Sequence, residues 1–149
     1  MPPLSKMTRA ASWILLALLG GLTLLGALGS ARFAYSRGAD QFGSVSMAEL
    51  TGGDEELVNL LHARRGTAAA YAAGFSVLLL LLVLIPYRRG EVWAWWAVLA
   101  GIVVSSCLIL LRVPFLGVQL GAGVAYMQLG VAGVALLLGI GRLRSSSPS

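Results

Sequence analysis

Cysteine, histidine and lysine are nearly absent from this sequence, which holds one residue of each: Cys107, His62 and Lys6. A single thiol cannot close an internal disulfide, so the chain is not a disulfide-built extracellular module. It also cannot provide a two-cysteine active site for thiol–disulfide exchange. A metal site made of His62 and the nearby carboxylates is conceivable, but one histidine without a second histidine or a cysteine is a weak signal for it. We therefore expect no metal and no cofactor.

Catalytic motifs are missing as well. The sequence has no nucleophile and base at a characteristic spacing, and no glycine-rich loop of the kind that binds phosphate. We therefore assign no catalytic residue, and the sequence does not indicate an enzyme. Acid or base catalysis by His62 on a lipid substrate at the membrane surface stays open as an alternative.

Charge is scarce throughout the chain. Charged residues make up 11% of the sequence, hydrophobic residues make up 58%, and the mean hydropathy is +0.84. A soluble domain has roughly 25% charged residues. The net charge of +5 could suggest nucleic-acid binding, but the basic residues lie at the ends of apolar runs, where membrane proteins carry them. We therefore predict a membrane protein that binds no nucleic acid.

Four apolar runs are long enough to cross a bilayer, whose hydrocarbon core requires about 20 apolar residues of helix. They cover about residues 12–30, 67–86, 92–111 and 115–140. The sequence thus predicts an all-α integral membrane protein, with four transmembrane helices in an antiparallel bundle that forms a single domain over residues 1–149. The polar segment 31–66 is predicted to be an extracytoplasmic loop.

The first run also fits a secretory signal peptide, because basic residues precede it and small residues follow it. It is slightly long for the apolar part of a signal peptide, so we expect a retained first span. No acidic or basic residue lies deep in any of the four runs. Ionisable residues inside the membrane usually mark ion and proton paths, and their absence argues against a pump, a proton-coupled carrier or a charged channel.

Residues 86–96 join the second and third runs and predict a turn at the membrane surface. Arg88 and Arg89 are costly to bury in hydrocarbon. Pro86 tends to end a helix and Gly90 eases a turn. Amphipathic aromatic side chains collect at the headgroup level. Four of them are predicted to lie there: Tyr87, Trp93, Trp95 and Trp96.

The loop 31–66 contains two signals for helix starts. Ser46 and Glu49 have the spacing of a capping box, in which each side chain binds the backbone of the other residue. Further on, three acids follow a glycine pair, and a helix dipole favours acids in the first turn. These acids are Asp54, Glu55 and Glu56. We expect a short amphipathic helix that lies at the interface or runs directly into the second span.

Small residues recur at four-residue spacing in the third and fourth runs, and such stripes let membrane helices pack closely. The two stripes are Ala97, Gly101 and Ser105, and Gly117, Gly121 and Ala125. Arg112 and Pro114 are expected to end the third helix. A very short turn then makes the third and fourth helices antiparallel neighbours.

Basic residues favour one orientation in the membrane. The side that holds both termini would carry Lys6, Arg9, Arg88, Arg89, Arg142 and Arg144, and the other side would carry Arg32, Arg37, Arg64, Arg65 and Arg112. Cytoplasmic segments carry the excess of basic residues, and the flanks of the first span weigh most. We therefore predict a multi-pass protein of the inner (plasma) membrane with both termini in the cytoplasm.

Several polar residues near or within the runs are candidates for contact with a lipid, a headgroup or another ligand. They are His62, Arg64, Arg65, Tyr71, Gln119, Tyr126 and Gln128. The amides have an alternative structural explanation, because buried amides in a bilayer usually hydrogen-bond between helices. An arginine pair suits an anionic headgroup, because guanidinium binds phosphate through a two-donor fork.

Two functions are favoured, and a small transporter is the least favoured third possibility, because no span centre carries charge. The leading hypothesis is a non-catalytic accessory or scaffolding subunit that packs against a larger membrane protein, or against further copies of itself, among membrane lipids. It rests on glycine-rich helix faces that outnumber what a four-helix bundle needs internally. The alternative is a lipid- or quinone-binding membrane protein, with or without activity on lipid, that has a pocket near the outer leaflet.

Overall fold

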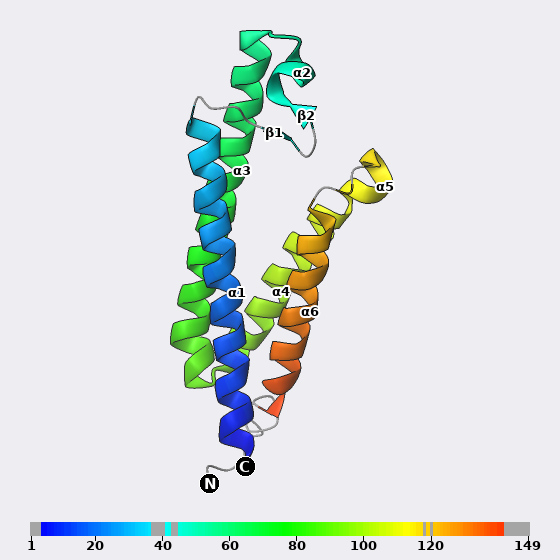
Figure 1. Cartoon of the computed structure of the whole chain (residues 1–149). Coiled ribbons are helices and arrows are strands. Elements are labelled where there is room, and N and C mark those ends of the chain that lie inside the picture. The colour runs from blue at the N-terminus through cyan, green and yellow to red at the C-terminus, as the bar shows by residue number, and fades with distance from the viewer. Residues whose placement is uncertain (1–3, 37–40, 43–44, 118, 120, 142–149) are drawn as a thin grey trace. The chain divides into compact units, whose positions relative to one another are not determined.

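The structure is a computed structural model that describes residues 4–36, 41–42, 45–117, 119 and 121–141. It is nearly all helical, as Figure 1 shows. In chain order, the helices are α1 (Leu4–Tyr35), α2 (Met47–Thr51), α3 (Glu55–Leu82), the π-helix η1 (Val83–Tyr87), α4 (Val92–Leu110), α5 (Arg112–Leu116) and α6 (Ala122–Leu138). The chain divides into two compact units, one of residues 1–21 and 78–149 and the other of residues 22–77.

The first unit is built around the pairing of α4 with α6 (Figure 1). Each helix buries one face whose residues recur every three or four positions, as helix periodicity requires. The buried residues are Ala94, Trp95, Val98, Ile102 and Ser106 on α4, and Ala125, Gln128, Ala132, Ala135 and Leu136 on α6. Three of the five buried residues of α6 are alanines, and such small side chains permit close helix packing.

The small-residue stripes do not form this interface as expected. Ala97, Gly101 and Ser105 are only half-buried, beside the buried face of α4. Gly117 and Gly121 are not helical, because both have the left-handed backbone conformation, with φ of 65° and 83°. Only Ala125 of the second stripe lies on a buried helix face.

A cluster of buried hydroxyl groups ties three segments of this unit together. The Ser12 hydroxyl donates to the carbonyl oxygen of Ala135 at 2.7 Å, and the Tyr87 hydroxyl lies 2.6 Å from the same Ser12 oxygen. Because Ser12 has a single proton and gives it to Ala135, Tyr87 is the donor in the second bond. Both side chains are fully buried. Nearby, the Trp95 indole nitrogen donates to the carbonyl oxygen of Leu136 at 3.0 Å.

This cluster changes the interpretation of two aromatic residues. Tyr87 and Trp95 were expected to face the headgroups, yet both are buried in the protein and bind polar groups there. Trp93 and Trp96 are each 55% exposed, so they remain outward-facing. A buried tryptophan or tyrosine usually hydrogen-bonds through its polar atom, and a neighbouring helix supplies the partner in both cases here.

Pro86 does not end its helix. It lies within the π-helix Val83–Tyr87, and the Arg88 N–H reaches the Val83 carbonyl while the Glu91 N–H binds the Pro86 carbonyl at 3.1 Å. A wider helical turn accommodates the missing proline donor, as at other π-bulges. The helix then ends at Gly90, whose φ of 92° is left-handed.

Pro114 does not end the third apolar helix either. The chain continues beyond Leu111 through α5, and the helical conformation ends at Gly117, whose φ of 65° is left-handed. Since Pro114 lies in the first turn of α5, its missing N–H costs few helical bonds. The apolar helix therefore extends from Val92 to Leu116, one turn further than predicted.

The second unit contains the C-terminal part of α1, the short antiparallel pair β1 (Gln41–Phe42) and β2 (Val45–Ser46), α2, and α3 as far as Val77. The predicted capping box is confirmed: Ser46 accepts from the Glu49 N–H at 3.2 Å, and Glu49 accepts from the Ser46 N–H at 3.0 Å. The expected helix after Gly53 forms and runs without interruption into the second apolar run.

Three helices are long and apolar enough to cross a membrane: Lys6–Tyr35, Glu55–Tyr87 and Val92–Leu116. The shorter apolar helix α6 covers Ala122–Leu138. Only 22%, 22% and 28% of the most apolar stretches of the three long helices are buried within the protein. These helices therefore direct most of their apolar side chains outward, as expected of a membrane protein.

Candidate functional site

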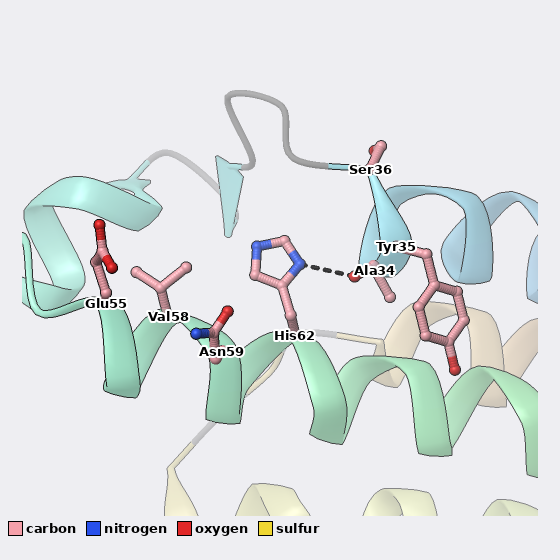
Figure 2. A pocket seen from close by; sticks show the side chains of 7 residues that line it. All are labelled: Ala34, Tyr35, Ser36, Glu55, Val58, Asn59 and His62. Atoms are coloured by element: carbon pink, nitrogen blue, oxygen red, sulfur yellow. Dashed lines mark hydrogen bonds between the residues drawn. The ribbon is translucent and has the colours of Figure 1, made fainter.

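The candidate site is an open cavity of about 470 Å³ in the second unit, between the end of α1 and the start of α3. Figure 2 shows its lining: Ala34, Tyr35, Ser36, Glu55, Val58, Asn59 and His62. The four α3 residues lie at intervals of three and four positions, so they share one helix face. This volume is within the range of small-molecule sites, about 300–1,000 Å³.

Asp54 positions this face of α3. Its carboxylate accepts from the N–H groups of Glu56 at 2.9 Å and of Leu57 at 3.3 Å. Asp54 is therefore the N-cap of the helix, where carboxylates are strongly favoured. The cap fixes where the helix starts, and so fixes Glu55 in the first turn and His62 two turns later.

His62 fastens α3 to the end of α1. Its Nδ1 lies 2.9 Å from the carbonyl oxygen of Ala34, drawn as the dashed line in Figure 2. A carbonyl oxygen can only accept, so Nδ1 carries the proton and donates it. In the neutral ring this leaves the lone pair on Nε2. The contact satisfies one of the last carbonyl groups of α1, which lack partners within the helix.

A second contact between α3 and the end of α1 lies one turn further along α3. The Arg65 guanidinium lies over the Phe33 ring, 5.5 Å from its centroid, and its Nε donates to the Ser30 hydroxyl at 3.5 Å. A cation over an aromatic face is attracted by the ring quadrupole. Arg65 and His62 together hold the two helix ends that form the cavity.

Gly66 leaves room for Tyr35 beside the cavity. A Cβ atom at Gly66 would lie 2.8 Å from the Tyr35 hydroxyl oxygen, closer than such atoms normally approach. The tyrosine ring can therefore lie against the buried backbone of α3 only because position 66 is glycine. The ring is one wall of the cavity in Figure 2.

The lining combines hydrogen-bond donors and acceptors with one carboxylate. Glu55 makes no ion pair with any residue that the structure describes. Within the described ranges, no group of three histidine, cysteine or acidic side chains could hold a metal ion. The polar groups of the lining are those of Tyr35, Ser36, Glu55, Asn59 and His62.

The other predicted contact residues are dispersed. In the second unit, Arg64 is exposed and Tyr71 is 78% exposed. In the first unit, Gln119 is exposed, Tyr126 is 61% exposed, and Gln128 is buried on the face of α6 that packs with α4. Of the seven candidates, only His62 lines the cavity, and Arg65 supports it.

Sequence reasoning missed most of the lining. Tyr35, Ser36 and Asn59 carry no motif, and Glu55 was assigned only to the helix dipole. The spacing of Glu55, Asn59 and His62 on one face was readable from the sequence. The sequence did not show that these residues lie beside the end of α1, because that depends on how far α1 continues beyond its apolar run.

Comparisons of the chain with protein-family models, with curated proteins and with solved structures find no match.

Proposed function

We propose that this protein is a non-catalytic, multi-pass membrane protein that packs inside the bilayer against a larger membrane protein or against another copy of itself. The observation that supports this is the small share of its apolar helices that the chain buries, 22–28% of their most apolar stretches. Lipid can cover such surfaces, but exposed glycines on them favour close contact with another helix.

The shorter apolar helix α6 also carries exposed glycines on its outward face. Gly130 and Gly133 are exposed, and a Cβ atom built at either would meet nothing within 4 Å. A glycine inside a helix lowers helix stability, so its presence requires a compensating reason. Close approach of a partner helix is that reason in a bilayer, where backbones meet across small residues.

We further propose that α6 is a fourth span and completes an antiparallel four-helix bundle. Its 17 residues rise about 26 Å, close to the hydrocarbon thickness of roughly 30 Å. In this arrangement the basic residues around Lys6 and Arg88 face the cytoplasm, and the segment 31–66 lies outside the inner membrane.

Purification in a mild detergent tests the proposal. The wild-type protein is expected to run as an oligomer or with a co-purifying membrane protein. Leucine at Gly130 and Gly133 should disrupt that association, because the larger side chains separate the backbones. Val124→Leu is the matched control, since Val124 is 63% exposed on the same helix but is not a small residue. A wild-type protein that runs as a lone monomer would refute the proposal.

The cavity at His62 supports a second candidate function, the binding of a lipid headgroup or a quinone. It lies just beyond the apolar runs of α1 and α3, at the depth where headgroups lie in the proposed topology, and it offers donors and acceptors to a polar head. Arg64 and Arg65 would provide charge for a phosphate.

Mass spectrometry of retained lipid and quinone tests this second function. His62→Ala and the double variant Arg64→Ala/Arg65→Ala should each lower retention of the ligand several-fold. Thr67→Val is the control, because Thr67 is exposed and its hydroxyl binds only within its own helix, to the Ala63 carbonyl at 3.0 Å. Unchanged retention in both variants would exclude the cavity as the site.

A further inference from the structure

A basic surface in the first unit combines two segments that are far apart in the sequence. The Arg88 guanidinium lies over the Trp13 ring, 5.1 Å from its centroid, so the turn after η1 is placed beside the first turns of α1. The bonds from Ser12 to Tyr87 and to Ala135, 2.6 and 2.7 Å long, hold this placement from the buried side.

The helix α1 extends this surface beyond Trp13. Lys6 and Trp13 are seven residues apart and Arg9 lies between them, so all three share one side of the helix. Lys6, Arg9, Arg88 and Arg89 are all exposed. We call these four residues together with Trp13 the basic surface.

Little negative charge opposes this surface. Glu91 is the only acidic residue in the sequence of the first unit. Its carboxylate already accepts a hydrogen bond from the Trp93 indole nitrogen. The surface is therefore strongly cationic, and its natural ligand is an anion.

Arg88 is prepared for such a ligand. Its cation–π contact with Trp13 restricts the side chain, and such a contact does not use up the five N–H donors of a guanidinium. Arg88 makes no hydrogen bond or ion pair with any residue in the described part of the chain. Those donors form the planar fork that binds phosphate through two parallel bonds.

We propose that the basic surface binds the phosphate headgroup of an anionic phospholipid, with Arg88 held by Trp13 as the principal contact. This inference rests on the proposed insertion into a membrane, because Trp13 lies at the start of an apolar run, at the depth of lipid headgroups. A free phosphate would lack the acyl chains that lie along the exposed apolar side chains Ile14 and Leu18 of the same helix. The geometry therefore favours a lipid.

Native mass spectrometry of the full-length protein tests this site. The protein in mild detergent is mixed with equal amounts of phosphatidylglycerol and phosphatidylcholine of matched acyl chains, and the bound lipids are counted. Phosphatidylglycerol should be preferred, and Arg88→Gln should lower that preference roughly fivefold, since each basic residue near an anionic surface contributes about that factor. Trp13→Leu should lower it as well, although it leaves the net charge unchanged.

Arg112→Gln is the matched control. Arg112 is exposed in the same unit but lies at the start of α5, outside the basic surface, and its loss changes the net charge equally. Equal effects of Arg88→Gln and Arg112→Gln would show that bulk charge attracts the lipid, and would overturn the proposal. An unchanged preference in Trp13→Leu, with helicity preserved by circular dichroism, would also overturn it.

Two further experiments distinguish failure of the lipid site from failure of membrane insertion. Inorganic phosphate that competes as well as phosphatidylglycerol at equal concentration would contradict a lipid site. Extraction of the protein from membranes by alkaline buffer without detergent would instead refute membrane insertion itself. The association tested with Gly130 and Gly133 does not depend on whether phosphate competes with the lipid, so its failure is distinguishable from the failure of the lipid site.

Discussion

At the residue scale, the buried hydroxyl cluster of the first unit depends on one glycine. Ser12 and Tyr87 are fully buried polar side chains that satisfy each other and the backbone of α6. An unpaired polar group in their position would cost about 1–3 kcal/mol. Gly139 is buried beside them, and a Cβ atom there would lie 2.9 Å from the Ser12 oxygen and closer still to the Tyr87 hydroxyl.

Gly139→Ala is therefore expected to destabilise the protein by about 1–3 kcal/mol, the typical cost of overpacking a well-packed core. Thermal unfolding in detergent, followed by circular dichroism, measures the effect. Gly123→Ala is the control and should be neutral or slightly stabilising, because nothing lies within 4 Å of its added methyl group. Equal stability of the two variants would contradict the described packing.

The sequence revealed little of this cluster. Ser12 was assigned only to the first apolar run, and Tyr87 and Trp95 to the headgroups. Aromatic side chains with a polar atom suit a headgroup layer and a buried hydrogen bond equally well. Which of the two they occupy depends on the helix opposite, here the carbonyl of Leu136 for Trp95. Composition and spacing do not contain that information.

At the element scale, helix caps were predictable because they are local. Ser46 and Glu49 form the capping box that their spacing indicates, and the acids after Gly53 start α3. Helix ends at proline were not predictable in the same way. Pro86 lies within a π-helical turn and Pro114 lies in the first turn of α5, so neither proline ends its helix. The helices end at Gly90 and Gly117, which have left-handed backbone conformations.

The capping box leads to a prediction about pH. The Ser46 backbone N–H, followed by the Ser46 hydroxyl, donates to Glu49 and holds the pKa of its carboxyl below the ordinary value of 4.5. Because the pKa is lowered in the folded state, the cap contributes its stability above 4.5 and loses it as the pH falls through the lowered pKa. An NMR titration of the Glu49 carboxyl carbon should show this shift.

Two variants complete that titration. Ser46→Ala removes the hydroxyl donor and should return the Glu49 pKa part of the way toward its ordinary value. Thr67→Val, remote from α2, should leave the titration unchanged. A midpoint at or above 4.5 in the wild-type protein would contradict the capping box.

The bend between α5 and α6 leads to a second prediction at this scale. Gly117 has a φ of 65°, and no atom lies within 4 Å of a Cβ atom built on it. Gly117→Ala should therefore cost about 1–2 kcal/mol through backbone strain alone, because left-handed conformations disfavour side chains. Chemical unfolding in detergent measures this cost. Gly123→Ala, with open space and no positive φ, is the control, and an equal loss in both would argue against the left-handed turn.

At the scale of the whole molecule, composition predicted the class well. Scarce charge and long apolar runs indicated helices able to cross a membrane, and three such helices are present. Scarce charge and long apolar runs are properties of whole segments, so the prediction of the class does not change if the predicted helix ends are wrong by a few residues. The fourth apolar run, predicted over about residues 115–140, forms a shorter helix, Ala122–Leu138. Gly117 and Gly121 have left-handed backbone conformations and are not part of that helix.

The candidate site was predicted only in part at this scale. His62 was selected because it is the single histidine at the end of an apolar run, and it does line the cavity. Tyr71 and Tyr126 were selected as polar residues of apolar helices, yet both are largely exposed. Polarity alone does not state which helix face a residue occupies once four runs of similar hydropathy can pack in several ways.

Accessibility of single cysteines to a membrane-impermeant maleimide tests the central claim, that the apolar helices cross the bilayer. Cys107, the only native cysteine, is first replaced by serine. In intact cells, Glu56→Cys should label, because the proposed topology places it outside the membrane, whereas Arg89→Cys should label only after permeabilisation. Labelling of both positions in intact cells would contradict a membrane-spanning chain, and labelling of Arg89→Cys alone would reverse its orientation.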